Sequence, residues 1–204
     1  MFDRFPALST ARLQLREVTL QDMDAAAELY GNSMMIKTFQ GHEKHLDIQP
    51  SKETRRTSVP EREAAAHRIQ EWFMTPHQEQ RGIRFGIYLK HSNRLIGSCG
   101  FCHWNKAHYK AELVFELHPE FRKRGLLKEA LNALFNFGFD TMKLNRIEAR
   151  VEGSNQAAHR TLLSLGFRHE GIEREAEFED GEFIDIACFS LLKSDGPPPV
   201  HLVK

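Results

Sequence analysis

Residues 111–130 read Ala111-Glu-Leu-Val-Phe-Glu-Leu-His-Pro-Glu-Phe-Arg-Lys-Arg-Gly-Leu-Leu-Lys-Glu-Ala130. Apolar side chains alternate up to Leu117, which is the period of a β-strand, and from Leu127 onward they recur at the spacing of an α-helix. A basic turn containing Gly125 joins the two patterns, without the glycine spacing of a Walker loop or a dinucleotide fingerprint. Backbone N–H groups at the start of a helix lack partners within the helix and, with the helix dipole, favour an anion. The segment therefore predicts a diphosphate-binding turn; the alternative is a charged surface loop that only begins a helix.

The composition is that of one globular domain without net charge. The chain has 204 residues with 28 Lys+Arg and 28 Asp+Glu, and 41% of its residues are hydrophobic. A neutral chain lacks the basic surface that nucleic-acid binding needs, and no stretch has the roughly 18–20 consecutive apolar residues of a membrane helix. The N-terminus lacks a signal-peptide pattern, and three cysteines indicate no disulfide framework. We therefore expect a cytoplasmic protein that binds neither nucleic acid nor membrane.

The order of the elements predicts a mixed sheet with helices packed on it. A single domain is expected over residues 1–193, with a polar loop at 41–60 and an extended, proline-rich tail at 194–204. A capping box at Ser58 and Glu61 predicts a helix that ends near Pro76. The expected strands cover 12–17, 83–89, 94–102, 113–117, 146–151, 167–174 and 182–192, and the other helices begin near 19, 125 and 155.

Several blocks, in order and spacing, resemble the GNAT family of N-acetyltransferases. The family's pyrophosphate loop has Gln or Arg, two variable residues, Gly, one variable residue, then Gly or Ala; here it reads Arg122-Lys123-Arg124-Gly125-Leu126-Leu127, and Leu127 departs from the pattern. Within the family the chain is most similar to the ribosomal-protein N-terminal (alanine) acetyltransferase branch. The blocks that carry this resemblance are Ala111–Pro119, Lys128–Ala130, Leu144–Ala149, Asn155–Phe167, Glu170-Gly171, Asp180-Gly181 and Asp185.

The resemblance implies a fold and a donor-binding site. The implied fold is a GNAT-like α/β (α+β) domain, with a mixed, mostly antiparallel sheet of about seven strands and helices on both faces. The implied reaction is direct acetyl transfer from acetyl-CoA to an amine, without a metal. The residues expected to bind acetyl-CoA are the pyrophosphate loop Arg122, Lys123, Arg124, Gly125, Leu126 and Leu127, the main chain of Leu117, and the Asn155 side chain, which also suits a helix N-cap.

The expected catalytic residues are Glu112 and Asn155. Glu112 and Glu116 lie on one face of their strand, where either carboxylate could face water, and Glu112 matches a glutamate of the resembled branch that would accept the amine proton. The alternative is a solvated or salt-bridged strand glutamate. The general acid stays unassigned, because Leu162 replaces the tyrosine that many family members use.

Other signals predict no additional site. Cys99-Gly-Phe-Cys102-His103 matches haem, zinc and redox motifs, but a spacing of three on a strand directs the two thiols to opposite faces. Three functions remain open: an acetyltransferase for a protein N-terminal α-amine, one for a small amine, and a CoA-binding module without turnover. The acceptor and the oligomeric state are left open as well.

Overall fold

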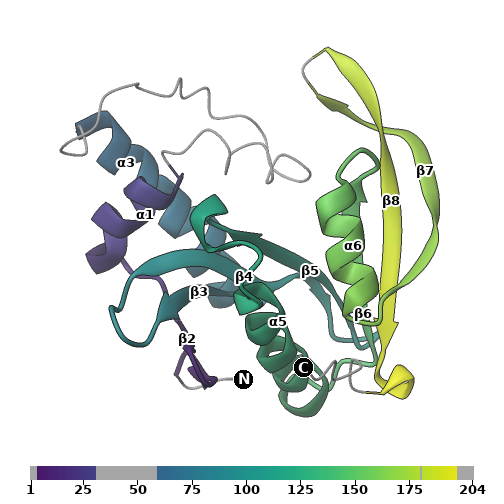
Figure 1. The fold of residues 1–204 in the computed structure, drawn as a ribbon, viewed down its shortest axis with the longest axis horizontal. Coiled ribbons are helices and arrows are strands. Elements are labelled where there is room, and N and C mark those ends of the chain that lie inside the picture. Colours follow the sequence, from purple (N-terminus) through teal and green to yellow (C-terminus); the bar gives the residue numbers. More distant parts are fainter. Residues whose placement is uncertain (1–3, 31–58, 180, 197–204) are drawn as a thin grey trace.

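The computed structural model describes residues 4–30, 59–179 and 181–196. One mixed sheet and the helices around it make up this part of the chain (Figure 1). The strands are β1 (Leu8–Ser9), β2 (Leu13–Arg16), β3 (Ile83–Leu89), β4 (Leu95–Asn105), β5 (Lys110–Leu117), β6 (Arg146–Glu152), β7 (Arg168–Glu179) and β8 (Glu182–Leu192). The α-helices are α1 (Met23–Tyr30), α3 (Val59–Arg68), α4 (Thr75–Gln78), α5 (Leu126–Asn136) and α6 (Gln156–Ser164), with short 3-10 or π-helical segments at Leu20–Asp22, Ile69–Met74, Pro119–Phe121, Phe137–Thr141 and Lys193–Asp195.

The sheet has eight strands in the order β1-β2-β3-β4-β5-β6-β8-β7. All neighbouring strands are antiparallel except β5 and β6, which are parallel. The extra strand relative to the expected seven is β1, whose two residues pair with β2. Two residues are too few to show an alternating pattern in a sequence. The expected mixed, mostly antiparallel sheet is otherwise confirmed.

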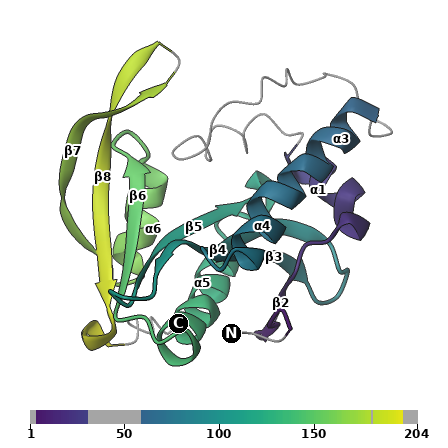
Figure 2. The same cartoon turned by 180° about the vertical axis from the view of Figure 1, so that it is seen from behind.

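Helices cover both faces of the sheet, as expected. α5 lies in front of the strands in Figure 1, and α3 and α4 lie in front of them in Figure 2. The core on the α5 side contains Leu131 and Phe135 together with strand residues such as Phe85. A second, smaller core contains Tyr30 of α1 and Phe73 from the segment after α3. Burying these apolar stripes against the sheet is what holds both helical layers in place.

The helix that was expected to end near Pro76 continues beyond it. α3 passes into the π-helical segment Ile69–Met74 and then into α4. At the end of this wide segment the Thr75 N–H donates to the Gln70 carbonyl, five residues back. Pro76 therefore lies in the first turn of α4, where its missing N–H is tolerated.

Other predicted boundaries agree with the structure. Thr19 and Asp22 form a capping box in the 3-10 turn before α1. Asn155 is the N-cap of α6, and its side chain accepts a hydrogen bond from the Ala158 N–H. These ends are set by residues close together in the chain, which is why they could be predicted.

Some expectations fall outside the described part of the chain. The predictions concerned are the Ser58 cap, most of the 41–60 loop and residues 197–204. Residues 194 and 195, which were expected in the extended tail, belong instead to the 3-10 turn Lys193–Asp195, in which Asp195 pairs with Arg168. Within the described ranges, no helix combines the length and apolar character needed to cross a membrane.

Candidate active site

The turn between β5 and α5 exposes the beginning of a helix. Gly125 precedes the first residue of α5 and has a left-handed backbone with φ of 72°. Lys123 also has a positive φ, 60°. A β-carbon at position 125 would come near only the Arg12 Nη2 atom, at 3.6 Å, so the backbone is accessible there. Left-handed residues in such a turn direct backbone N–H groups into a shared concavity, which suits an anion.

The side chains of the predicted pyrophosphate loop divide between solvent and core. Arg122, Lys123 and Arg124 are exposed, whereas Leu126 is buried. Leu127 is half-buried and packs against the main core. The core therefore accommodates the side chain that replaces the family's Gly or Ala, and the backbone N–H of Leu127 stays in the first turn of α5.

A contact between α5 and the N-terminal strands holds this turn in place. Glu129 accepts hydrogen bonds from the Thr10 hydroxyl, from the Arg12 N–H at 2.8 Å and from Arg12 Nε at 2.7 Å. Arg12 Nη1 also donates to the Arg124 carbonyl oxygen at 3.1 Å. Partial burial raises the pKa of Glu129, but these hydrogen bonds outweigh burial and hold that pKa below its ordinary value. Sequence patterns did not reveal this contact, because 117 residues separate Arg12 from Glu129.

Glu129→Gln is therefore expected to loosen the turn. We expect the free energy of unfolding to fall by about 1 kcal/mol, because charge-assisted bonds are replaced by neutral ones in a partly exposed pair. A lowered carboxyl pKa stabilises the fold above the ordinary value of 4.5, and this contribution is lost as pH falls through the lowered pKa. Urea unfolding measured from pH 7 to pH 3 should show the free energies of unfolding of the unmodified chain and of Glu129→Gln becoming equal at acid pH. The control is Glu120→Gln, because Glu120 is an exposed residue just before the turn. An equal loss of unfolding free energy in this control would contradict the stabilising role assigned to Glu129.

β5 and β6 are parallel neighbours only at their N-terminal ends. They pair through Lys110–Arg146, Ala111–Ile147 and Glu112–Glu148. The His118 N–H donates to Ile96 of β4, so Leu117 directs its own N–H and carbonyl to the opposite edge, toward β6. Arg122 Nε donates to the Leu117 carbonyl at 3.1 Å. The main chain of Leu117 thus faces the side on which the two strands have separated.

Asn155 lies at the other side of this separation, just after β6. Its Oδ1 atom accepts the Ala158 N–H at 3.1 Å. The predicted N-cap role is confirmed, and the Nδ2 group remains a donor for a second partner.

Glu112 and Glu116 share a strand face as predicted, but neither is solvated. Glu112 is 7% exposed and Glu116 is 2% exposed. The expectation that either carboxylate could face water is therefore wrong. Sequence alternation identifies the face of a strand, but only the tertiary structure shows what covers that face.

Glu116 is held in a buried network. Its carboxylate accepts hydrogen bonds from Tyr30 Oη at 2.6 Å, Ser98 Oγ at 2.5 Å and Arg84 Nη2 at 3.1 Å. Burial, reinforced by the nearby Glu116 charge, raises the pKa of Tyr30 well above its ordinary value, so its hydroxyl stays protonated and donates. The salt-bridged alternative for Glu116 is thus what the structure contains. Arg84 was the overlooked signal: it interrupts the buried strand Ile83–Leu89, where a charge needs a partner.

Arg84→Met should destabilise the fold strongly. The Arg84 and Glu116 side chains are 7% and 0% exposed, so the variant leaves a buried carboxylate without its guanidinium partner. We expect a loss of about 3–5 kcal/mol in the free energy of unfolding. The matched control is Arg81→Met, two residues before β3 begins, where the side chain is 68% exposed. Urea unfolding measures both; a loss below 1 kcal/mol in Arg84→Met would contradict the expected effect.

Glu112 contacts the histidine of the discounted cysteine motif. Its Oε2 atom lies 3.0 Å from His103 Nδ1, and Cys102 Sγ lies 3.7 Å from the same nitrogen. Cys99 points into the opposite core, as its spacing predicts, and burial raises the pKa of its thiol.

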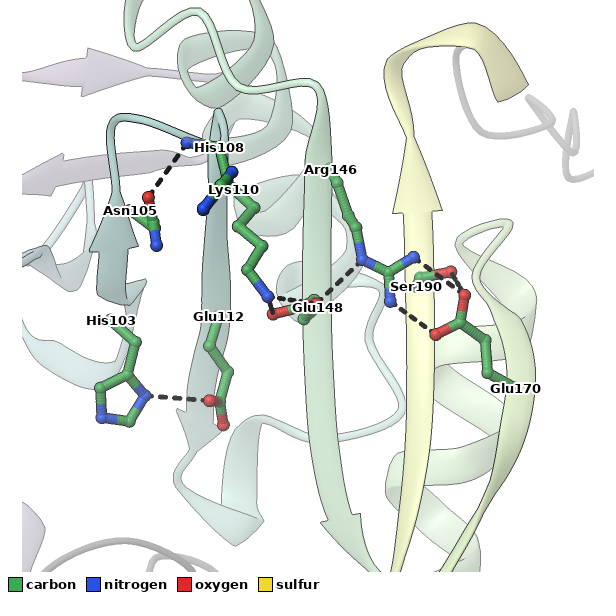
Figure 3. Close-up of polar contacts among 9 residues, drawn as sticks. All are labelled: His103, Asn105, His108, Lys110, Glu112, Arg146, Glu148, Glu170 and Ser190. Carbon is green, nitrogen blue, oxygen red and sulfur yellow. Dashed lines mark hydrogen bonds and ion pairs between the residues drawn. The ribbon is translucent and has the colours of Figure 1, made fainter.

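A row of polar side chains crosses the adjacent strands (Figure 3). Glu148 accepts bonds from Lys110 and Arg146, while Glu170 accepts bonds from Arg146 and Ser190. The Arg146 hydrogen bond, followed by that of Ser190, lowers the pKa of Glu170 to about 2, so this carboxylate stays ionised. The row links β5, β6, β8 and β7 beside Glu112.

Leu162 and Ala158 have no acidic group, and the tyrosines Tyr30 and Tyr109 lie in packing or exposed positions. Leu162 is fully buried and Ala158 is 8% exposed. Tyr109 is 58% exposed, and the Tyr30 hydroxyl is engaged by Glu116.

Comparison with known proteins agrees with this architecture. The acetyltransferase (GNAT) domain family model matches residues 12–168. The uncharacterized N-acetyltransferase YoaA of Bacillus subtilis (strain 168) is 33% identical over 189 residues, 93% of this chain and 98% of the relative. The ribosomal protein uS5-alanine N-acetyltransferase of Escherichia coli (strain K12) is 25% identical over 123 residues, 60% of this chain and 63% of the relative.

A solved structure with the same fold is that of the microcin C7 self immunity acetyltransferase MccE in complex with acetyl-CoA and AMP. It has a TM-score of 0.73 and 19% identity, and the match covers 90% of this chain and 93% of that chain.

Proposed function

Since the chain belongs to the GNAT acetyltransferase family, we propose that it transfers the acetyl group of acetyl-CoA directly to a primary amine, the N-terminal α-amine of a protein. The observation that carries this proposal is the separation of β5 from β6 beyond Glu112 and Glu148, next to the exposed start of α5. A donor molecule can pass between the strands there while its phosphates lie on the helix start. Both features are built by the backbone.

The donor-binding residues in this proposal surround that separation. The N–H groups of the turn from Arg124 to Leu127 bind the pyrophosphate, and Arg122, Lys123 and Arg124 supply positive charge. Leu117 pairs with the pantetheine arm through its main chain, and Asn155 donates through Nδ2. A hollow of about 430 Å³ beside the turn is lined by Arg124 of the turn, by the cationic side chains Arg12 and Lys90, and by apolar residues such as Phe121 and Leu126. The residues present therefore fit a long, polyanionic thioester.

Glu112 acts as the base in this proposal. As the amine nitrogen attacks the thioester carbonyl, a C–N bond forms, the C–S bond breaks, and Glu112 accepts the amine proton directly or through a water. The Leu117 N–H stabilises the charge that develops on the carbonyl oxygen. The thiolate leaves and takes a proton from solvent, since a thiol pKa of about 8.5 requires little acid catalysis.

The acceptor is the finer part of the proposal. An α-amine has a pKa of about 8, so a modest base is enough to generate its neutral form near pH 7. The name of the Escherichia coli relative gives the alanine of a ribosomal protein as the acceptor of that enzyme. We extend this acceptor class, a protein N-terminus, to the present chain.

The test is acetyl-CoA binding by calorimetry, followed on the same sample by thiol release. The acceptor panel contains peptides with free N-termini, the same peptides with blocked N-termini, and small amines such as polyamines. Release that depends on the free peptide N-terminus supports the proposal, whereas release with small amines alone replaces it with the small-amine function. Binding without release from any acceptor contradicts the proposed transfer and favours a CoA-binding module.

A further inference from the structure

Three metal-ligating side chains meet at the end of β4. The Cys102 Sγ, His103 Nδ1 and Glu112 carboxylate atoms lie within 4.8 Å of one another. Cys102 and Glu112 are register partners on neighbouring strands. His103 follows Cys102 directly, and side chains of successive strand residues normally point to opposite faces. Here the pairing shifts register after Cys102 and His103 has a φ of 48°, so its ring turns toward Glu112 (Figure 3).

We propose that Cys102, His103 and Glu112 bind one divalent transition-metal cation of the zinc type. With a metal–sulfur distance of about 2.3 Å and metal–nitrogen and metal–oxygen distances of about 2.0–2.1 Å, tetrahedral angles separate S from N by about 3.6 Å and N from O by about 3.4 Å. The observed separations are 3.7 Å for Cys102 Sγ to His103 Nδ1 and 3.0 Å for His103 Nδ1 to Glu112 Oε2. Small side-chain rotations bring the three donors to one centre.

The donor chemistry selects this class of cation. One thiolate, one imidazole and one carboxylate form a mixed S, N and O set that suits zinc and not the hard cations Mg²⁺ and Ca²⁺. The two anionic donors neutralise the charge of a divalent ion. Three protein ligands leave the fourth tetrahedral position to water, and the 65% exposed side chain of His103 provides access from solvent.

A cationic side chain of β6 near the cluster also contacts other carboxylates. Arg150 is the cation on β6 that interacts with Glu112, and its guanidinium is bonded to Glu173 and lies 3.6 Å from Glu177. Its charge is thus shared with two other carboxylates.

Cation binding at this cluster is expected to affect catalysis, and this expectation rests on the proposed function, in which Glu112 is the base. A Glu112 carboxylate that donates its lone pair to a metal cannot accept a proton from the amine. The bound cation therefore inhibits acetyl transfer, and removing the cation restores it.

The experiment titrates Co²⁺ and then Zn²⁺ into the full chain after dialysis against a chelator, with a reductant that does not bind metals. Co²⁺ reports the Cys102 ligand, because a thiolate bound to it gives a charge-transfer band in the near ultraviolet. We expect one Co²⁺ per chain, a band that Zn²⁺ abolishes, and no such band in Cys102→Ser. In His103→Ala the Kd should rise more than about 100-fold, since even outer-shell partners of a metal ligand contribute 10–100-fold.

Cys188→Ser is the matched control, because Cys188 is a half-exposed thiol on β8 outside the cluster. A band that persists in Cys102→Ser, disappears in Cys188→Ser or is absent from the unmodified chain would overturn the metal site. Zn²⁺ should inhibit thiol release by the unmodified chain but not by Cys102→Ser. Co²⁺ binding in a chain without any transferase activity would refute the proposed function and leave the site standing, whereas activity without a Co²⁺ band would do the reverse.

Discussion

Glu112→Gln is expected to lower kcat for acetyl transfer by about 100- to 10,000-fold, the usual contribution of a general base. Gln is close in shape to Glu and can still contact His103, which lies 3.0 Å from the Glu112 carboxylate. The fold should therefore survive, while the group that accepts the amine proton is lost. The acid limb of the pH–kcat profile, where an ionised base becomes protonated, should disappear with it.

Glu148→Gln is the matched control for this variant. Glu148 is the β6 register partner of Glu112, and its carboxylate is bonded to Lys110 and Arg146. The Glu148→Gln variant removes one negative charge next to Glu112 but leaves the proposed base itself unchanged. Steady-state kinetics across pH distinguish the two variants. An acid limb that persists in Glu112→Gln would return Glu112 to a structural role.

Arg122→Glu combined with Arg124→Glu is expected to raise the Kd for acetyl-CoA at least about 100-fold. Each charge-assisted hydrogen bond contributes about 1.5–3 kcal/mol, and every 1.4 kcal/mol is a factor of ten in affinity. Reversal also places two carboxylates next to phosphates. Arg122 Nε also donates to the Leu117 carbonyl at 3.1 Å, so the variant loses a contact that positions the β5 edge to which we assign the pantetheine arm.

Calorimetry at two salt concentrations measures the Kd for acetyl-CoA. The difference in Kd between the variant and the unmodified chain should become smaller as ionic strength rises, because salt screens the charges. Arg81→Glu combined with Arg174→Glu makes the same change in net charge away from the turn and is the control. An unchanged Kd in the Arg122 and Arg124 variant would contradict the placement of the pyrophosphate. A tenfold or larger rise in the control would show that net charge, and not the turn, governs binding.

The strand, turn and helix around Gly125 could be predicted because their signals are local. Alternation up to Leu117, a glycine able to adopt positive φ and an apolar stripe from Leu127 are all contained in residues 111–135. The Asn155 cap is local in the same sense, since its partner is the Ala158 N–H. A phosphate-binding turn uses backbone groups at a helix start, so residue spacing alone can indicate it.

The partners of Glu116 and Glu129 could not be predicted from the sequence and were shown only by the tertiary structure. Glu116 meets Arg84 and Tyr30 from positions 32 and 86 residues away, and Glu129 meets Arg12 across 117 residues. Strand register decides these meetings, and a shift of one residue would direct every side chain of a strand to the other face.

The sequence alone thus established the order of elements and the glycine-containing turn before α5, to which we assign the phosphates, because backbone geometry and residue spacing act within one segment. Only the packed sheet buried Glu112 and placed it beside Cys102 and His103, because burial and cross-strand contact depend on which distant segments become neighbours.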